Sequence, residues 1–175
     1  METHNMSRFT PRSQSPSFLG RMFGSGDANS AVDLDTWLAS TLKRELKLEE
    51  IERDEDGDIP IQCGSAMVFI HPDDESSCIT VFAPLLEDFA MRPEVYEAIN
   101  AINRKIPFAK AIVDPDIKQI VLVAELHIFD GLASEQLMAT IDLVTETADH
   151  YDTLLQKRFG GKTMLDDADE GEFDV

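Results

Sequence analysis

Three aspartates at alternate positions are the residues most suited to binding a metal ion. Asp54, Asp56 and Asp58 carry carboxylate oxygens, the ligands that Ca²⁺ prefers. An EF-hand loop beginning at Asp54 needs glycine at its sixth position and glutamate at its twelfth, but this chain has isoleucine and serine there. Asp56-Gly57 is instead typical of a tight hairpin turn, because glycine readily adopts a positive φ. We therefore predict a turn here and no metal site.

Residues that serve as nucleophiles or general bases are scattered along the chain. Ser65 and Ser134 lie outside any nucleophile elbow, and Gly24 and Gly26 do not begin a phosphate-binding loop. None of the four histidines has another histidine four residues away, as a zinc-binding helix requires. They are His4, His71, His127 and His150. No catalytic spacing emerges, so we expect a protein that is not an enzyme and that uses no cofactor.

The two cysteines, Cys63 and Cys78, match no metal-binding or redox spacing. If the chain turns at residues 73–76, their positions along the paired strands differ by about seven residues, at about 3.3 Å per residue. That separation is several times the reach of a disulfide bond. We expect two unpaired thiols, as in a reducing cytoplasm, which is the location that we predict.

Composition and charge exclude several classes of protein. The chain has 175 residues, of which 43% are hydrophobic, enough for one packed domain. It has 15 Lys and Arg against 34 Asp and Glu, a net charge of −19, so the clustered cations of a nucleic-acid-binding protein are missing. The longest aliphatic run, 120–124, is too short for a transmembrane segment. The charge favours a basic protein or peptide partner.

We expect a folded domain over 31–161, a disordered N-terminal tail before it and an acidic C-terminal tail after it. The N-terminal tail, 1–30, is rich in Pro, Ser and Gly and has a net charge of +1, whereas the acidic C-terminal tail, 162–175, has a net charge of −5. The N-terminal tail contains one apolar cluster, Phe18, Leu19, Met22 and Phe23. The cluster is either an incidental part of the tail or a short docking motif for a groove, on this protein or on another.

Three segments have the periodicity of amphipathic helices. The first is expected from Asp33 to about Leu46, the second from Pro93 to about Ile106, and the third from a cap at Ser134 to the glycine pair after residue 159. The third segment carries an apolar seam at steps of three and four residues: Leu137, Ile141, Val144, Ala148, Tyr151 and Leu155. Such a seam packs on the protein's own sheet, which is commoner, or against a second chain.

Strand patterns lie between these helices. Residues 48–53 and 59–61 are expected to flank the Asp56-Gly57 turn, and strands are expected at 65–71, 78–85, 108–113 and 117–129. The fold class is therefore α+β, an antiparallel sheet with helices packed on it, in the order α-β-β-β-α-β-β-α.

Several stretches resemble YbjN-type bacterial proteins. They are Asp56–Ile61, Gly64–Phe69, Ala83–Leu86, Ala98–Asn103 and Leu155–Gly161. The likeness covers roughly residues 33–161 and implies a fold similar to that of the class I type III secretion chaperones. Those chaperones are small acidic proteins, usually homodimers, that hold a partner polypeptide in extended form. The resemblance implies a shape more than a mechanism, because YbjN-type proteins have been linked to regulation without a settled activity.

We accordingly expect a chaperone-like module that binds polypeptide segments and forms a homodimer. The candidate groove residues are Trp37, Leu38, Val68, Ile70, Ile79 and Val81. The candidate dimer residues on the second helix are Val95, Ile99 and Ile102. For each of these residues, ordinary core packing is the alternative. A regulatory adaptor that acts through its two tails is the alternative function.

Overall fold

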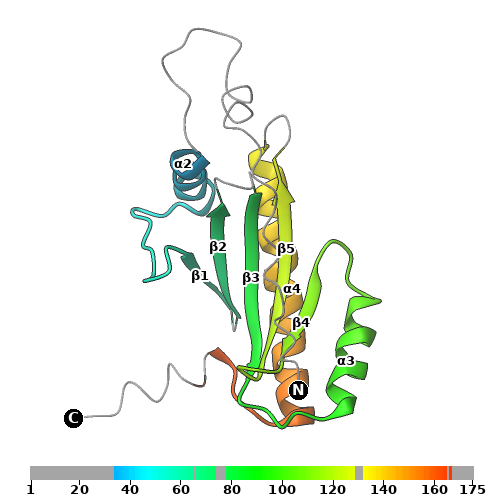
Figure 1. Cartoon of the computed structure of the whole chain (residues 1–175). Coiled ribbons are helices and arrows are strands. Elements are labelled where there is room, and N and C mark those ends of the chain that lie inside the picture. The colour runs from blue at the N-terminus through cyan, green and yellow to red at the C-terminus, as the bar shows by residue number, and fades with distance from the viewer. Residues whose placement is uncertain (1–33, 65, 74–77, 129–131, 165, 167–175) are drawn as a thin grey trace, which may run out of the picture.

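The computed structural model describes residues 34–64, 66–73, 78–128, 132–164 and 166, which form an α+β fold (Figure 1). The expected fold class and element order are confirmed. The three helices are α2 (Leu34–Leu46), α3 (Pro93–Asn103) and α4 (Ser134–Phe159). The five strands are β1 (Ile59–Cys63), β2 (Ala66–Asp73), β3 (Cys78–Glu87), β4 (Lys110–Asp114) and β5 (Gln119–His127).

The five strands form one antiparallel sheet in the order β1-β2-β3-β5-β4. The register places Ile70 opposite Val81 and Val81 opposite Ala124, so these three side chains share one face of the sheet. Residues two positions along each strand continue the same face, which is almost entirely buried. We call it the core face.

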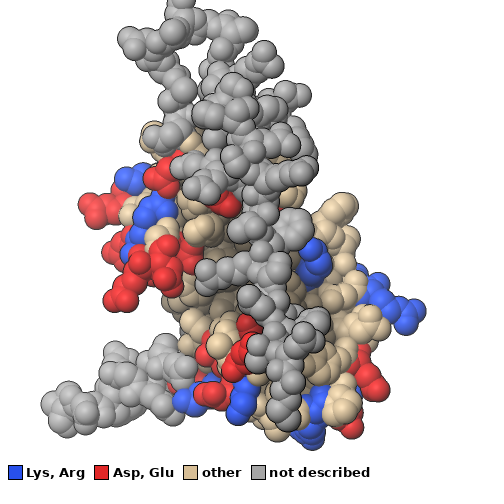
Figure 2. Space-filling model, viewed as in Figure 1, with Lys and Arg blue, Asp and Glu red and all other residues tan. Residues whose placement is uncertain are grey.

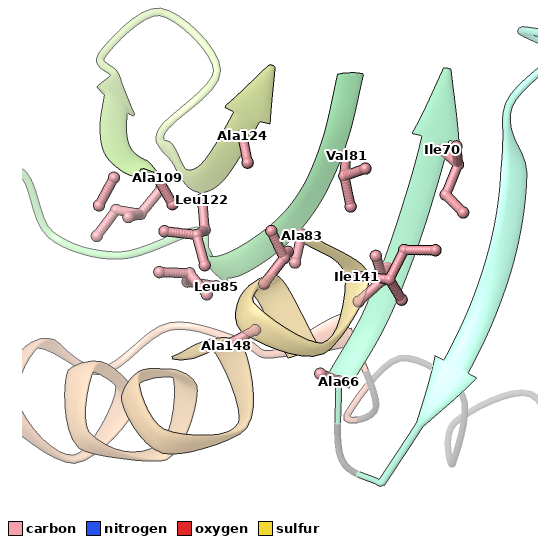
Figure 3. Close-up of a cluster of buried hydrophobic side chains, with 14 of the residues drawn as sticks. Ala66, Ile70, Val81, Ala83, Leu85, Ala109, Leu122, Ala124, Ile141 and Ala148 are labelled. Atoms are coloured by element: carbon pink, nitrogen blue, oxygen red, sulfur yellow. The ribbon is translucent and has the colours of Figure 1, made fainter. Parts of the chain in front are cut away.

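The helices pack on the core face and leave the opposite face without a helix among the described residues. Buried side chains of α2, α3 and α4 join one cluster with the sheet residues of the core face. Figure 3 shows Val81, Ala83 and Leu122 on the sheet beside Ile141 and Ala148 of α4. The apolar seam of α4 is therefore core, as the commoner alternative predicted, and only Tyr151 of that seam is half-buried.

The two ends of α4 are held in different ways. Ala133 occupies the cap position, one residue before the expected Ser134, and its N–H donates to Oε1 of Gln136 at 3.1 Å. Gly160 ends the helix with a φ of +71°, as expected from the sequence. Gly161 follows with a φ of +92°, and a Cβ there would collide with the backbone oxygen of Glu87. Only glycine fits this second position.

The chain continues past residue 161 in contact with the domain. The backbone of Lys162 exchanges two hydrogen bonds with Glu87, at 2.8 and 2.9 Å. The Asp166 carboxylate accepts hydrogen bonds from the N–H and hydroxyl of Thr163, at 2.8 and 2.9 Å, and from the amide of Gln156. These hydrogen bonds lower the pKa of Asp166, because they stabilise its ionised form. The first residues of the expected acidic tail are thus bound to the domain, and 167–175 lie outside the described residues.

Residues 48–53 do not form the expected strand. The turn itself is present, with a φ of +87° at Gly57, and Oδ1 of Asp54 accepts the N–H groups of Asp56 and Asp58 at 3.0 and 2.8 Å. Arg53 is held by an ion pair to Asp35 of α2, which draws the segment toward the helix instead of a neighbouring strand. The prediction failed because weak alternation competes poorly with side-chain hydrogen bonding to the backbone.

Helix α3 ends at Asn103, three residues before the expected Ile106. The Asn103 side chain leaves the helix to bind the edge strand β4. Its Nδ2 donates to the carbonyl of Ala111 at 2.9 Å, and its Oδ1 accepts the Ala111 N–H at 2.7 Å. This amide satisfies both backbone groups of one residue on the outer edge of the sheet.

Candidate functional site: the uncovered face of the sheet

The groove positions expected from the sequence lie mostly in the core. Five of the six are fully buried, with no exposed area, and Trp37 on α2 is half-buried. The five are Leu38, Val68, Ile70, Ile79 and Val81. In this structure they pack on the core face instead of lining an open groove, which is the alternative that the sequence analysis retained.

The positions expected at a dimer contact are buried as well. Val95, Ile99 and Ile102 are 0%, 5% and 6% exposed. They belong to the same cluster as Ala109 and Ala111, next to β4. These three side chains pack within their own chain, so a dimer contact made by α3 would need other residues.

The apolar side chains that face away from the core lie one residue further along the strands. Phe69 pairs with Phe82, and Phe82 pairs with Val123, which makes an apolar row over β2, β3 and β5 that ends at Lys110 on β4. A second row links Pro84, Val121 and Ile112. With Pro60 and Met67 these residues form what we call the apolar patch: Pro60, Met67, Phe69, Phe82, Pro84, Ile112, Val121 and Val123.

The patch is a surface feature. The rings of Phe69 and Phe82 stack with their centroids 5.2 Å apart, and both residues are half-buried. Ile112 is 48% exposed. Figure 1 views the sheet from this side, with α4 behind β3 and β5. An apolar sheet face over which no described helix packs is typical of a protein interaction surface.

Two polar rows border the patch at the end of the sheet where β2 finishes. The first contains His71, Thr80 and Glu125, and the second contains Asp73, Cys78 and His127. The pKa of the Cys78 thiol is raised, first by burial and then by the negative charge of Glu125. The carboxylates of Glu125 and Asp73 place negative charge beside the apolar surface.

An acidic segment stands at the same corner. Residues 49–58 contain seven Asp or Glu and one Arg. The segment is attached to β2 through Asp58, whose Oδ1 lies 2.6 Å from Nδ1 of His71, and Arg53 Nη1 donates to the carbonyl of Gly57 at 2.7 Å. Figure 2 shows acidic side chains gathered over α2 and the chain that precedes β1. Within residues 49–58, acidic side chains therefore outnumber basic ones by seven to one.

The described residues include no group of three or more His, Cys, Asp or Glu placed to hold a metal ion. Cys63 and Cys78 are unpaired, on strands separated by β2, where their neighbours Ala66 and Asp73 lie seven positions apart. The described helices include none that is long and apolar enough to cross a membrane.

Sequence reasoning missed the patch although its signal was present. Residues 66–70 and 79–83 are apolar at nearly every position, so β2 and β3 each offer two apolar faces. Alternation along each strand assigns these residues to two opposite faces. Only the position of α4 shows which of the two faces the helix covers. The tail cluster lies outside the described residues; it consists of Phe18, Leu19, Met22 and Phe23. Most of the two tails through which a regulatory adaptor would act lies outside them as well.

Comparison with solved structures shows the same fold. A chain of the ExsC–ExsE complex has a TM-score of 0.56 at 18% identity, covering 71% of this chain and 97% of that one. A chain of the HopA1–SchA chaperone–effector complex gives 0.55 at 11% identity, covering 72% and 99%. YbjN from E. coli gives 0.54 at 18% identity, covering 71% and 92%. No curated protein matches the chain.

The family model that matches is described as "T3SS (YopN, CesT) and YbjN peptide-binding chaperone 1". It covers residues 32–167, which include every helix and strand of the described part of the chain. The resemblance to YbjN-type proteins with a type III secretion chaperone-like fold is thereby confirmed. This chain belongs to the family of type III secretion and YbjN peptide-binding chaperones.

Proposed function

We propose that this protein is a non-enzymatic cytoplasmic module that holds an extended polypeptide segment on the apolar patch. The observation that carries the proposal is an apolar sheet face without a described helix over it. Beside it lies what we call the acidic corner: Asp73, Glu125 and residues 49–58. Membership of a peptide-binding chaperone family supports the same conclusion.

The patch supplies affinity, and the acidic corner supplies selectivity. Each large apolar side chain that a partner buries contributes about 1.5–3 kcal/mol, so two or three such side chains balance the cost of ordering a short segment. Glu125, Asp73 and residues 49–58 attract cations and repel acidic segments. The preferred partner is therefore an apolar segment with flanking Lys or Arg.

The test uses two fluorescent pools of unstructured peptides that share the same apolar residues. One pool carries Lys and Arg, and the other carries Glu at the same places. We expect the basic pool to bind the full-length chain, more weakly as salt increases, and the acidic pool not to bind.

Variants locate the site. The double substitution Ile112→Asp/Val123→Asp places two charges on the patch and is expected to weaken binding of the basic pool at least tenfold. Leu154→Asp is the matched control, because Leu154 on α4 is 49% exposed and Ile112 is 48% exposed. Equal losses from the patch variant and from Leu154→Asp would refute the proposal, as would equal binding of the two pools.

We also propose that the protein forms a homodimer. The contact would lie at the exposed end of the unit that α3, β4 and the residues between them form. Phe108 is 92% exposed with a φ of +61°, an uncommon conformation for a phenylalanine, and Tyr96 on the same unit is 50% exposed. Light scattering should give twice the 19.5 kDa mass of one chain for the unaltered protein. For Phe108→Ser it should give the mass of a single chain. A single mass of 19.5 kDa for the unaltered protein would contradict the dimer.

A further inference from the structure

We propose that residues 18–23 of this chain occupy the apolar patch of the same molecule and compete with a partner segment. The inference rests on the proposed function, because it names a regulator of the same site. It assigns one occupant to a surface that no described helix covers.

The chemistry of the segment matches that of the patch. Residues 18–23 read Phe-Leu-Gly-Arg-Met-Phe, with four large apolar side chains and one cation. The patch offers the stacked rings of Phe69 and Phe82 next to Val123. The polar row beside it includes Glu125, a suitable partner for the Arg21 guanidinium.

The charge of the N-terminal tail also favours its binding at the apolar patch. The N-terminal tail, 1–30, has Arg8, Arg12 and Arg21 against two acids, whereas the whole chain carries −19. The acidic C-terminal tail would be repelled by the acidic corner, but the N-terminal tail is attracted to it. It is the one end of the chain with both apolar residues and net positive charge.

The connection is long enough to reach the patch. Ten residues, 24–33, separate Phe23 from Leu34, where the described chain begins. Fully extended they span about 35 Å, and β3, with ten residues, is about 33 Å long. Helix α2 begins at Leu34 and contacts β2, one of the strands of the patch.

Attachment makes even weak docking effective. A linker of ten residues, four of them Gly or Ser, allows an effective concentration on the order of 1 mM. A segment with a dissociation constant of about 0.1 mM would then occupy the patch in about nine molecules of ten. A partner would see its affinity reduced roughly tenfold.

The first experiment measures this competition in the full-length chain. Phe18→Asp/Phe23→Asp removes the cluster, and Phe9→Asp is the matched control in the same tail. We expect the basic peptide pool to bind the double variant at least fivefold more tightly than the unaltered chain, and the Phe9→Asp chain to bind like the unaltered one. Equal affinity for all three chains would overturn the inference while leaving the proposed function intact.

The second experiment needs no added peptide. A benzoylphenylalanine photocrosslinker at position 23, with position 9 as control, should form crosslinks within one chain to peptides that contain Phe69, Phe82 or Val123. This result would support the inference even if no foreign peptide bound, in which case the proposed function alone would fail. Crosslinks that join two chains, that fall on α4, or that are equally frequent from position 9 would overturn it.

Discussion

At the residue scale, Asn103 shows how one side chain protects a sheet edge. Its amide binds both backbone groups of Ala111 on edge strand β4. Without these hydrogen bonds, the backbone of an edge-strand residue such as Ala111 can pair with a strand of another molecule. Proteins commonly prevent such edge-to-edge pairing. Any partner strand must therefore bind elsewhere than the middle of β4.

We predict that Asn103→Ala lowers the free energy of unfolding by about 1–2 kcal/mol, because two hydrogen bonds are lost. Asn100→Ala is the control, since Asn100 is exposed on the same helix. Urea denaturation of both full-length variants measures the difference. Equal stability of the two variants would mean that the amide contributes nothing to the edge.

Cys78 gives stability a specific pH dependence. The pKa of its thiol in the folded state is raised above the ordinary value of 9.0, mainly by burial and by Glu125. Above that ordinary value the unfolded chain loses a proton that the folded chain keeps, so stability falls as pH rises. The loss ends where pH passes the folded-state pKa.

We therefore predict that the unfolding free energy of the unaltered chain declines between pH 8 and pH 10 more than that of Cys78→Ala. Other titrating groups are common to both chains and cancel in the difference. Cys63→Ala keeps Cys78 and should decline like the unaltered chain. Parallel curves for the unaltered chain and Cys78→Ala would exclude the effect.

The sequence does not show which apolar residues of a strand face the core. On β2, Val68 is buried on the core face, and its neighbour Phe69 lies on the apolar patch. Both are apolar, so no pattern in the sequence distinguishes them. Burial is decided by where α4 packs, which depends on contacts between residues more than 50 positions apart in the chain.

At the element scale, α4 is the helix that the sheet depends on most. It packs along β3 and also contacts β2 and β5. Ile141 is buried at the contact with the sheet and is only 1% exposed, whereas Leu154, on the same helix, is 49% exposed. The two residues therefore separate core packing from surface exposure within one element.

We predict that Ile141→Ala lowers the free energy of unfolding by about 2–4 kcal/mol, because it leaves a cavity in the core. Leu154→Ala should change it by less than about 0.5 kcal/mol. Chemical denaturation with light scattering on both variants provides the check. A change of mass without loss of stability for Ile141→Ala would instead place the seam at an interface.

Elements with strong periodicity were predicted well, and irregular segments were not. The glycine pair after residue 159 and the proline at residue 93 mark helix ends by their backbone preferences alone. Residues 48–53 were misjudged, because Arg53 and Asp54 make side-chain contacts that alternation does not reveal. The early end of α3 likewise depends on Asn103 reaching β4, a contact between elements.

At the scale of the whole molecule, the core and the proposed binding surface lie on opposite faces of the sheet. Among the described residues, one face of the sheet carries the three helices and the core, and the other carries half-buried apolar side chains. Figure 2 shows the acidic side chains near α2. A partner bound at the proposed site would therefore leave the core undisturbed. The same division explains why a change on the patch is expected to alter affinity more than stability.

The most direct test of peptide binding on the patch is photocrosslinking from the face itself. A benzoylphenylalanine is placed at position 112, or at position 154 as the equally exposed control, and the basic peptide pool is added. We predict that the labelled peptides crosslink to position 112 and not to position 154, and that high salt reduces the yield. Equal labelling at both positions, or labelling only at position 154, would contradict binding on the uncovered face of the sheet.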